Sequence, residues 1–136
     1  MAFDYGGKRT GIAVSDPLQI VATGLTTVSS ETIFDFLKTY LRNETVECFV
    51  VGEPKNLDNS PSEIAGEVNA FVVLLQKNYP DIPVRRIDER FSSKMAAQTL
   101  FASGLKKKQR QNKSLLDEVS ATIILQGFME MKHLKI

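Results

Sequence analysis

Residues 2–16 read Ala-Phe-Asp-Tyr-Gly-Gly-Lys-Arg-Thr-Gly-Ile-Ala-Val-Ser-Asp, and this stretch predicts a β-hairpin whose turn carries charge. An apolar strand start leads to Asp4, and a pair of glycines follows. Glycine takes positive φ without steric cost and leaves the backbone bare, so the pair favours a tight turn that an anionic group can approach. The two cations that come next, Lys8 and Arg9, favour a phosphate as that group. Taken alone, the stretch also fits a plain hairpin with a solvated tip.

The composition is that of one ordinary globular domain over residues 1–136. The chain is 43% hydrophobic and 24% charged with a formal net charge of +1, so any basic surface for nucleic acid must be local. One cysteine and one histidine exclude an internal disulfide and a zinc site of the Cys/His type. Cys48 lies in an apolar run, which favours a buried structural thiol. Because no signal-peptide or membrane-spanning pattern occurs, we expect a cytoplasmic protein without a membrane partner.

Strand and helix patterns alternate after the hairpin. Ser29-Ser30 offers an N-cap, and Ser60-Pro61-Ser62-Glu63 combines an N-cap, a first-turn proline and a capping-box glutamate. The expected elements are a strand over 19–27, a helix over 29–43, a strand over 46–52, a helix over 60–79, a strand over 83–90, a helix from Ser92 to just before Gly104, and a last helix over 114–130.

This order of elements predicts an α/β fold. Three antiparallel strands followed by two strands that helices separate would form a mixed five-stranded sheet with helices on its faces. Right-handed crossovers would place the fourth strand beside the first, parallel to it. That arrangement is the ribonuclease H-like fold.

Three carboxylates lie where such a fold would gather them. Asp4 and Glu89 stand at the carboxyl ends of strands expected to run parallel, where open α/β sheets place their sites. Asp117 shares a helical stripe with Ala121, Ile124 and Phe128, so it faces the core side of the last helix. A carboxylate cluster without zinc ligands suits Mg²⁺ or Mn²⁺, and a pair of such ions can activate water at a phosphodiester.

Each of these acids also has an ordinary interpretation. Asp117 could act as the capping partner of Ser114 and complement the helix dipole. Glu89 could be a solvated turn residue whose exposed partner is Arg90. The residues alone leave these alternatives open.

Four segments resemble the motifs of the YqgF/RuvX family. They are Phe-Asp-Tyr-Gly-Gly-Lys-Arg-Thr-Gly at 3–11, Val-Val-Gly-Glu-Pro at 50–54, Asp-Glu-Arg-Phe-Ser at 88–92, and residues 113–117 with the apolar positions that follow. The resemblance covers the whole chain in the family's order. It implies a ribonuclease H-like fold related to Holliday-junction resolvases, and a nuclease that matures the 5′ end of pre-16S rRNA.

The resemblance also implies the site. Asp4, Glu89 and Asp117 match the family's acidic residues, so they are the expected catalytic and metal-binding residues, with two Mg²⁺ or Mn²⁺ ions as the cofactor. The chain departs from the family pattern at Glu53, where an apolar residue is common, and at Asn59, where glycine is common. Because related resolvases place an acid near the end of that strand, the resemblance makes Glu53 a candidate for a fourth metal-facing carboxylate.

The leading expectation is a divalent-metal-dependent hydrolase that cleaves structured RNA, with ribosomal precursor particles as a partner. Cations would hold the nucleic-acid backbone by charge, namely Lys8, Arg9, Arg90, Lys106, Lys107, Lys108, Arg110 and Lys113. A Holliday-junction resolvase that cuts branched DNA and a ribosome-assembly factor without chemistry are alternatives. A phosphotransferase of the actin and sugar-kinase type is a third, but such enzymes clamp ATP between two domains and this chain supplies one.

Overall fold

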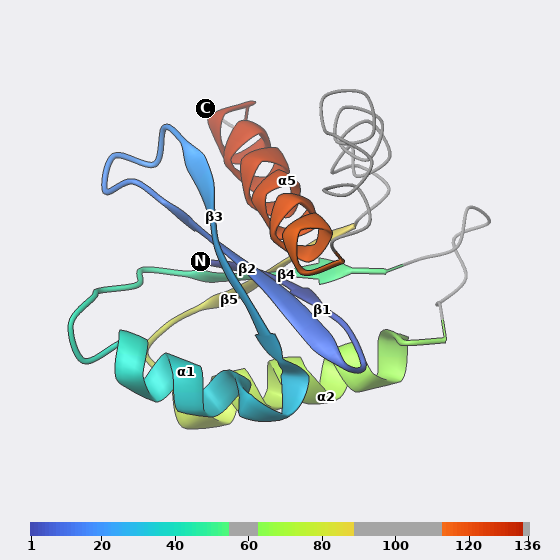
Figure 1. Cartoon of the computed structure of the whole chain (residues 1–136). Coiled ribbons are helices and arrows are strands. Elements are labelled where there is room, and N and C mark those ends of the chain that lie inside the picture. Colours follow the sequence, from blue (N-terminus) through green and yellow to red (C-terminus); the bar gives the residue numbers. More distant parts are fainter. Residues whose placement is uncertain (55–62, 89–112, 135–136) are drawn as a thin grey trace.

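The computed structural model describes residues 1–54, 63–88 and 113–134, in which a five-stranded sheet has helices on both faces (Figure 1). The strands are β1 (Ala2–Tyr5), β2 (Arg9–Ser15), β3 (Ala22–Ser29), β4 (Phe49–Glu53) and β5 (Val84–Asp88). The helices are α1 (Ile33–Tyr40), which follows the 3-10 turn η1 (Ser30–Thr32), α2 (Ala65–Asn78) and α5 (Lys113–Leu134).

The sheet has the strand order β3-β2-β1-β4-β5. The pairs β1–β2 and β2–β3 are antiparallel, whereas β4 runs parallel to both β1 and β5. The mixed sheet and the place of the fourth strand beside the first are therefore confirmed, as right-handed crossovers require. Because β1, β4 and β5 run parallel, their carboxyl ends meet at one edge of the sheet, where Asp4, Glu53 and Asp88 lie.

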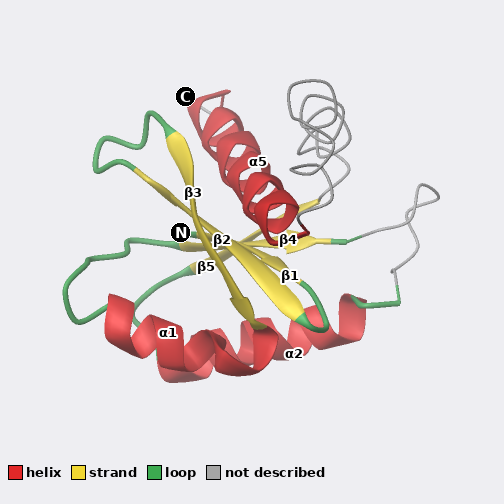
Figure 2. Cartoon of the chain, viewed as in Figure 1, coloured by secondary structure: helices red, strands yellow, loops and turns green. Residues whose placement is uncertain are grey.

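Alternate residues of the central strands face two separate cores. Figure 2 shows α5 crossing one face of the sheet while α1 and α2 cover the other. On the α2 side, the rings of Phe3 and Phe71 meet edge to face with centroids 5.3 Å apart. On the α5 side, Ala2 belongs to a buried cluster with Ala121 and Ile124. The alternation along β1 thus directs Phe3 and Tyr5 toward α2, and Ala2 and Asp4 toward α5.

The helix boundaries differ from the sequence predictions. The predicted start of α2 at Ser60-Pro61 is wrong, because residues 63–64 form a turn and the helix begins at Ala65. The predicted cap at Ser29 is also wrong, since its side chain makes no capping bond to the described backbone and α1 begins at Ile33. Lys113 is the first residue of α5 rather than part of a preceding loop. The predicted helix after Ser92 lies outside the described residues.

The third strand begins later than predicted, because residues 16–21 form a turn instead. One carboxylate oxygen of Asp16 accepts hydrogen bonds from the backbone amides of Ile20 at 2.7 Å and Val21 at 2.8 Å. These amides, Val21's foremost, hold the pKa of Asp16 below its usual value. Gln19 adopts a positive φ of 56° within the turn. The segment 19–21, with its β-branched Ile20 and Val21, therefore connects two strands and does not open β3.

Candidate active site

Gly11 on β2 determines how closely α5 approaches the sheet. A Cβ atom at this position would overlap the backbone carbonyl of Asp117 and lie 3.0 Å from the backbone nitrogen of Glu118. No glycine in the described part of the chain has a positive φ, so Gly11 is needed for space rather than for an unusual backbone angle. The same holds at Gly6 in the hairpin turn, where a Cβ would overlap the carbonyl oxygen of Arg9. A strand glycine thus lets the helix backbone rest directly on the sheet.

Asp4 lies beside that contact. Asp4 and Gly11 are Cα partners in the β1–β2 register. Residues directly opposite each other in an antiparallel pair point to the same face of the sheet. Because the vacant side of Gly11 faces the backbone of Asp117, Asp4 also points toward α5. The structure therefore brings Asp4 and Asp117 to one face, on either side of Gly11.

Arg9 pairs with Asp117 and lies near Asp4. Its Nε donates to Oδ2 of Asp117 at 2.9 Å, and the two side chains are 40% and 24% exposed. Arg9 opens β2 two residues before Gly11, so its side chain takes the same face of the sheet. In the sheet it is a diagonal neighbour of Asp4, which faces Gly11. A half-exposed ion pair thus lies next to the second carboxylate.

The capping interpretation of Asp117 is wrong. The helix begins at Lys113, and its first turn contains no acidic residue. Asp117 is instead on the stripe predicted for it, because Ala121 and Ile124 are fully buried against the sheet. Its carboxylate stays at the edge of this core and pairs with Arg9.

The side chain of Glu53 lies on the face of the sheet that α1 and α2 cover. Phe49 and Val51 of β4 are buried in the core beneath α1 and α2, and the alternation of the strand places Glu53 on that side too. Glu53 is paired in register with Asp88, which takes the same face. This placement contradicts a role for Glu53 beside Asp4.

Most of the remaining predicted site residues lie outside the described part of the chain. Glu89 follows β5 and lies outside the described residues, as do Arg90, Lys106, Lys107, Lys108 and Arg110. Ile87, two residues before Glu89, is buried against α5. Lys8 is exposed in the hairpin turn.

The donors at this face fit a hard cation. Asp4 and Asp117 offer carboxylate oxygens without cysteine or histidine nearby in sequence, which is the chemistry that Mg²⁺ and Mn²⁺ prefer. Within residues 1–54, 63–88 and 113–134, no three acidic, His or Cys side chains form a complete metal cluster. The described face therefore supplies two of the three predicted ligands.

Comparison with known proteins identifies the family. The model of the RuvX family, described as Holliday junction resolvase, matches residues 1–131. The chain belongs to the RuvX family. A relative from Flavobacterium johnsoniae is 54% identical over 133 residues, which cover 98% of this chain and 96% of the relative. A relative from Bacteroides fragilis is 52% identical over 134 residues, covering 98% and 97%. Both bear the name "Putative pre-16S rRNA nuclease".

RuvX membership confirms the resemblance found in the sequence and the ribonuclease H-like fold that it implied. It gives no support to the phosphotransferase alternative. None of the helices in the described ranges has the length and apolar character needed to cross a membrane.

Ser30 holds the hairpin turn between β1 and β2 in place through hydrogen bonds. Its hydroxyl donates to the carbonyl of Gly6, so the 2.9 Å bond between Ser30 and Thr10 uses the Thr10 hydroxyl as donor. The backbone amide of Ser30 donates to the carbonyl of Lys8 at 3.0 Å. Thr10 is fully buried. One serine therefore holds both arms of the turn that leads from Asp4 to Arg9.

We expect Ser30→Ala to lower the free energy of unfolding by about 1–3 kcal/mol, because the Gly6 carbonyl and the buried Thr10 hydroxyl would lose their partner. Ser29→Ala is the matched control, since Ser29 is exposed, and should change stability by less than about 0.5 kcal/mol. Urea denaturation measures both. Equal losses in the two variants would contradict the role assigned to Ser30.

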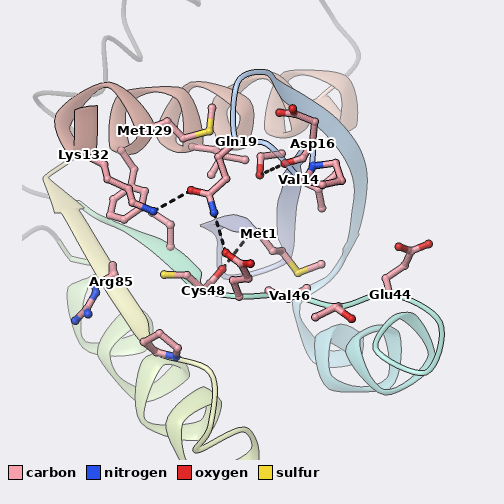
Figure 3. Close-up of a pocket in the computed structure, with 18 of the residues that line it drawn as sticks. Met1, Val14, Asp16, Gln19, Glu44, Val46, Cys48, Arg85, Met129 and Lys132 are labelled. Atoms are coloured by element: carbon pink, nitrogen blue, oxygen red, sulfur yellow. Dashed lines mark hydrogen bonds between the residues drawn. The ribbon is translucent and has the colours of Figure 1, made fainter. Parts of the chain in front are cut away.

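A hollow of about 890 Å³ lies at the opposite end of the sheet, between the amino ends of β1, β4 and β5 and the last turns of α5 (Figure 3). Gln19 spans it, accepting a 3.0 Å bond from Lys132 and donating a 2.9 Å bond to Glu47. Burial raises the pKa of the Cys48 thiol at its wall, which keeps the thiol protonated and agrees with a structural role. The carboxylates lie at the other end, so this hollow is not the candidate active site.

Sequence reasoning missed two features of the site. The sequence predicts a phosphate contact for Arg9 and gives no sign of its pairing with Asp117, 108 residues away in the chain. Gly11 carried a usable signal, since an isolated glycine within a strand pattern indicates a bulge or a close backbone approach. The ion pair had no such local signal.

Proposed function

We propose that this chain is a nuclease that hydrolyses phosphodiester bonds of pre-16S rRNA during maturation of its 5′ end. The observation that carries the proposal is the convergence of Asp4 and Asp117 across Gly11, at the carboxyl edge of the parallel strands. The names of the relatives supply the substrate.

The reaction that we propose depends on divalent metal. Asp4, Asp117 and Glu89 would hold Mg²⁺ or Mn²⁺, in one or two sites. When bound, such ions supply an activated water and stabilise the charge on the leaving oxygen. The chain's own contribution is position: Asp4 lies on a central strand, and the backbone at Asp117 is pressed against Gly11. Carboxylates held in this way need little reorganisation when a substrate binds.

Substrate binding would come from charge rather than from a surface that reads sequence. Lys8 is exposed in the hairpin turn next to Arg9 and the candidate site. We propose that it contacts the RNA backbone together with Arg90, Lys113 and the cations at 106–110. Such contacts hold phosphates without discriminating between bases.

A branched DNA substrate is the second candidate, because the family model that matches residues 1–131 is described as Holliday junction resolvase. The carboxylate edge suits any phosphodiester, so its geometry does not choose between the two nucleic acids.

The decisive experiment compares wild type, Glu89→Gln and Glu130→Gln on a 5′-extended 16S rRNA fragment and on a four-way DNA junction, over a Mn²⁺ titration. Glu89→Gln should lose cleavage by about 10²-fold or more and retain binding, since the change removes charge but keeps shape. Glu130 is exposed on α5, so Glu130→Gln should cleave like wild type.

Three results would redirect the proposal. Cleavage of the junction but not of the RNA would show that the substrate is branched DNA. RNA binding by wild type without product at every Mn²⁺ concentration would make the chain a binding factor. Normal turnover by Glu89→Gln would remove Glu89 from the site.

A further inference from the structure

We propose that Arg9 is a positioning residue for Asp117, and that its guanidinium competes with the divalent cation for the same carboxylate. The inference rests on the proposed metal-dependent function and assigns Arg9 a role that phosphate binding does not include.

The contact itself is specific. Nε of Arg9 lies 2.9 Å from Oδ2 of Asp117, so one carboxylate oxygen is already engaged by a positive charge. Asp117 cannot move away easily, because the backbone at this residue rests on Gly11. A cation that takes Asp117 as a ligand must therefore bind the second oxygen, Oδ1, against the charge of the nearby guanidinium, or share Oδ2 with Arg9, or displace the guanidinium.

The surroundings allow that displacement. The Arg9 side chain is 40% exposed, so the guanidinium can enter solvent at small cost. Without a cation, Arg9 offsets the repulsion between Asp117 and Asp4, which share this face of the sheet. With a cation bound, that compensation is no longer required.

A displaced Arg9 would still be useful. It lies at the start of β2, next to the exposed Lys8 of the hairpin turn. The guanidinium would then be free for a phosphate oxygen, a group that it matches well. Arg9 thus pairs with Asp117 before the cation binds, and it contacts a phosphate of the substrate afterwards.

Mn²⁺ binding in the absence of RNA tests the competition, measured by isothermal titration calorimetry and by the Mn²⁺ electron paramagnetic resonance signal. Arg9→Ala should bind Mn²⁺ about three- to tenfold more tightly than wild type, because the competing charge is gone. The same variant should melt at a lower temperature than wild type in chelator, and the difference should shrink in saturating Mn²⁺.

Two matched variants separate this role from general electrostatics. Lys8→Ala removes the same charge one residue away, and it should leave Mn²⁺ affinity within about twofold of wild type because Lys8 is exposed. Arg9→Lys restores a cation at the pair and should return the affinity toward that of wild type. If Arg9→Ala does not fold, Arg9→Gln tests the competition, because it removes the charge and keeps a long polar side chain that should give the same tighter Mn²⁺ binding.

The two hypotheses fail differently. If wild type binds Mn²⁺ and Arg9→Ala binds it no more tightly than Lys8→Ala does, Arg9 does not compete and this inference is overturned while the metal site stands. If wild type binds no Mn²⁺, the metal-dependent function and this inference fall together.

Discussion

Gly11→Ala is expected to abolish nuclease activity and to lower the free energy of unfolding by about 1–3 kcal/mol or more. The added methyl group would overlap the backbone carbonyl of Asp117, and backbone atoms cannot move aside as a flexible side chain can. Overpacking of this kind forces a backbone shift. The shift must carry the start of α5, and with it Asp117, away from Asp4.

Gly66→Ala is the matched control for this substitution. Among the described residues, nothing lies within 4 Å of a Cβ at Gly66, and the residue is within α2. Alanine there should leave activity intact and stabilise the protein by up to about 1 kcal/mol, since it favours the helix. Chemical denaturation and a cleavage assay measure both variants. A Gly11→Ala protein as stable and active as wild type would show that α5 does not depend on this contact.

Asp4→Asn should separate a metal site from a structural carboxylate. In chelator at neutral pH, we expect this inactive variant to be at least as stable as wild type, because it relieves the repulsion between Asp4 and Asp117. In Mn²⁺ the order should reverse. At a Mn²⁺ concentration of about 100 times Kd, wild type gains about 2.7 kcal/mol by linkage, whereas the variant binds the ion less well and gains less.

Asp35→Asn is the control for Asp4→Asn. Asp35 is exposed on α1, far from the site, and Asp35→Asn removes the same charge as Asp4→Asn. This variant should therefore respond to Mn²⁺ as wild type does. Thermal melts of the three proteins, with EDTA and with Mn²⁺, measure the response. A loss of stability by the same margin in both conditions, for Asp4→Asn, would argue that Asp4 is structural.

The sheet could be predicted because its signals are local and strong. The apolar strand start at residues 2–3 and the apolar run at 49–51 each follow the pattern of a buried strand, and both lie in central strands of the sheet. The crossover rule then left one place for the fourth strand. The stripe that places Asp117 at the core edge was equally readable, since it depends on residues within one helix.

The start of α2 shows where local patterns fail. Ser60-Pro61-Ser62-Glu63 has the residues of a capping box, yet the helix begins at Ala65. Ile64 packs against the core beneath the sheet, and its carbonyl accepts the amide of Val68 at 3.0 Å. The packing of Ile64 is a tertiary contact that the capping-box pattern does not report, so the pattern alone did not locate the first residue of the helix.

The contacts that Asp117 makes with Arg9 and Gly11 could not be predicted from the sequence, and the reason is a different one. Arg9 on β2 contacts Asp117 on α5, and a prediction of this contact from sequence would need the register of two strands and the distance at which the helix packs on the sheet. Neither quantity can be inferred from a short stretch of residues. Gly11 indicated a close backbone approach, but it did not indicate which segment approaches.

The order in which the chain is synthesised gives the Gly11 contact one more consequence. Asp4 leaves the ribosome well before Asp117, because Asp117 lies on α5, which comes after every strand. Until that helix folds, one face of the sheet lacks the buried residues that α5 contributes, and Asp4 lacks its neighbouring acid. A nascent chain therefore cannot assemble the proposed nuclease site, and any cutting of RNA must wait until the helix has left the ribosome and docked on Gly11.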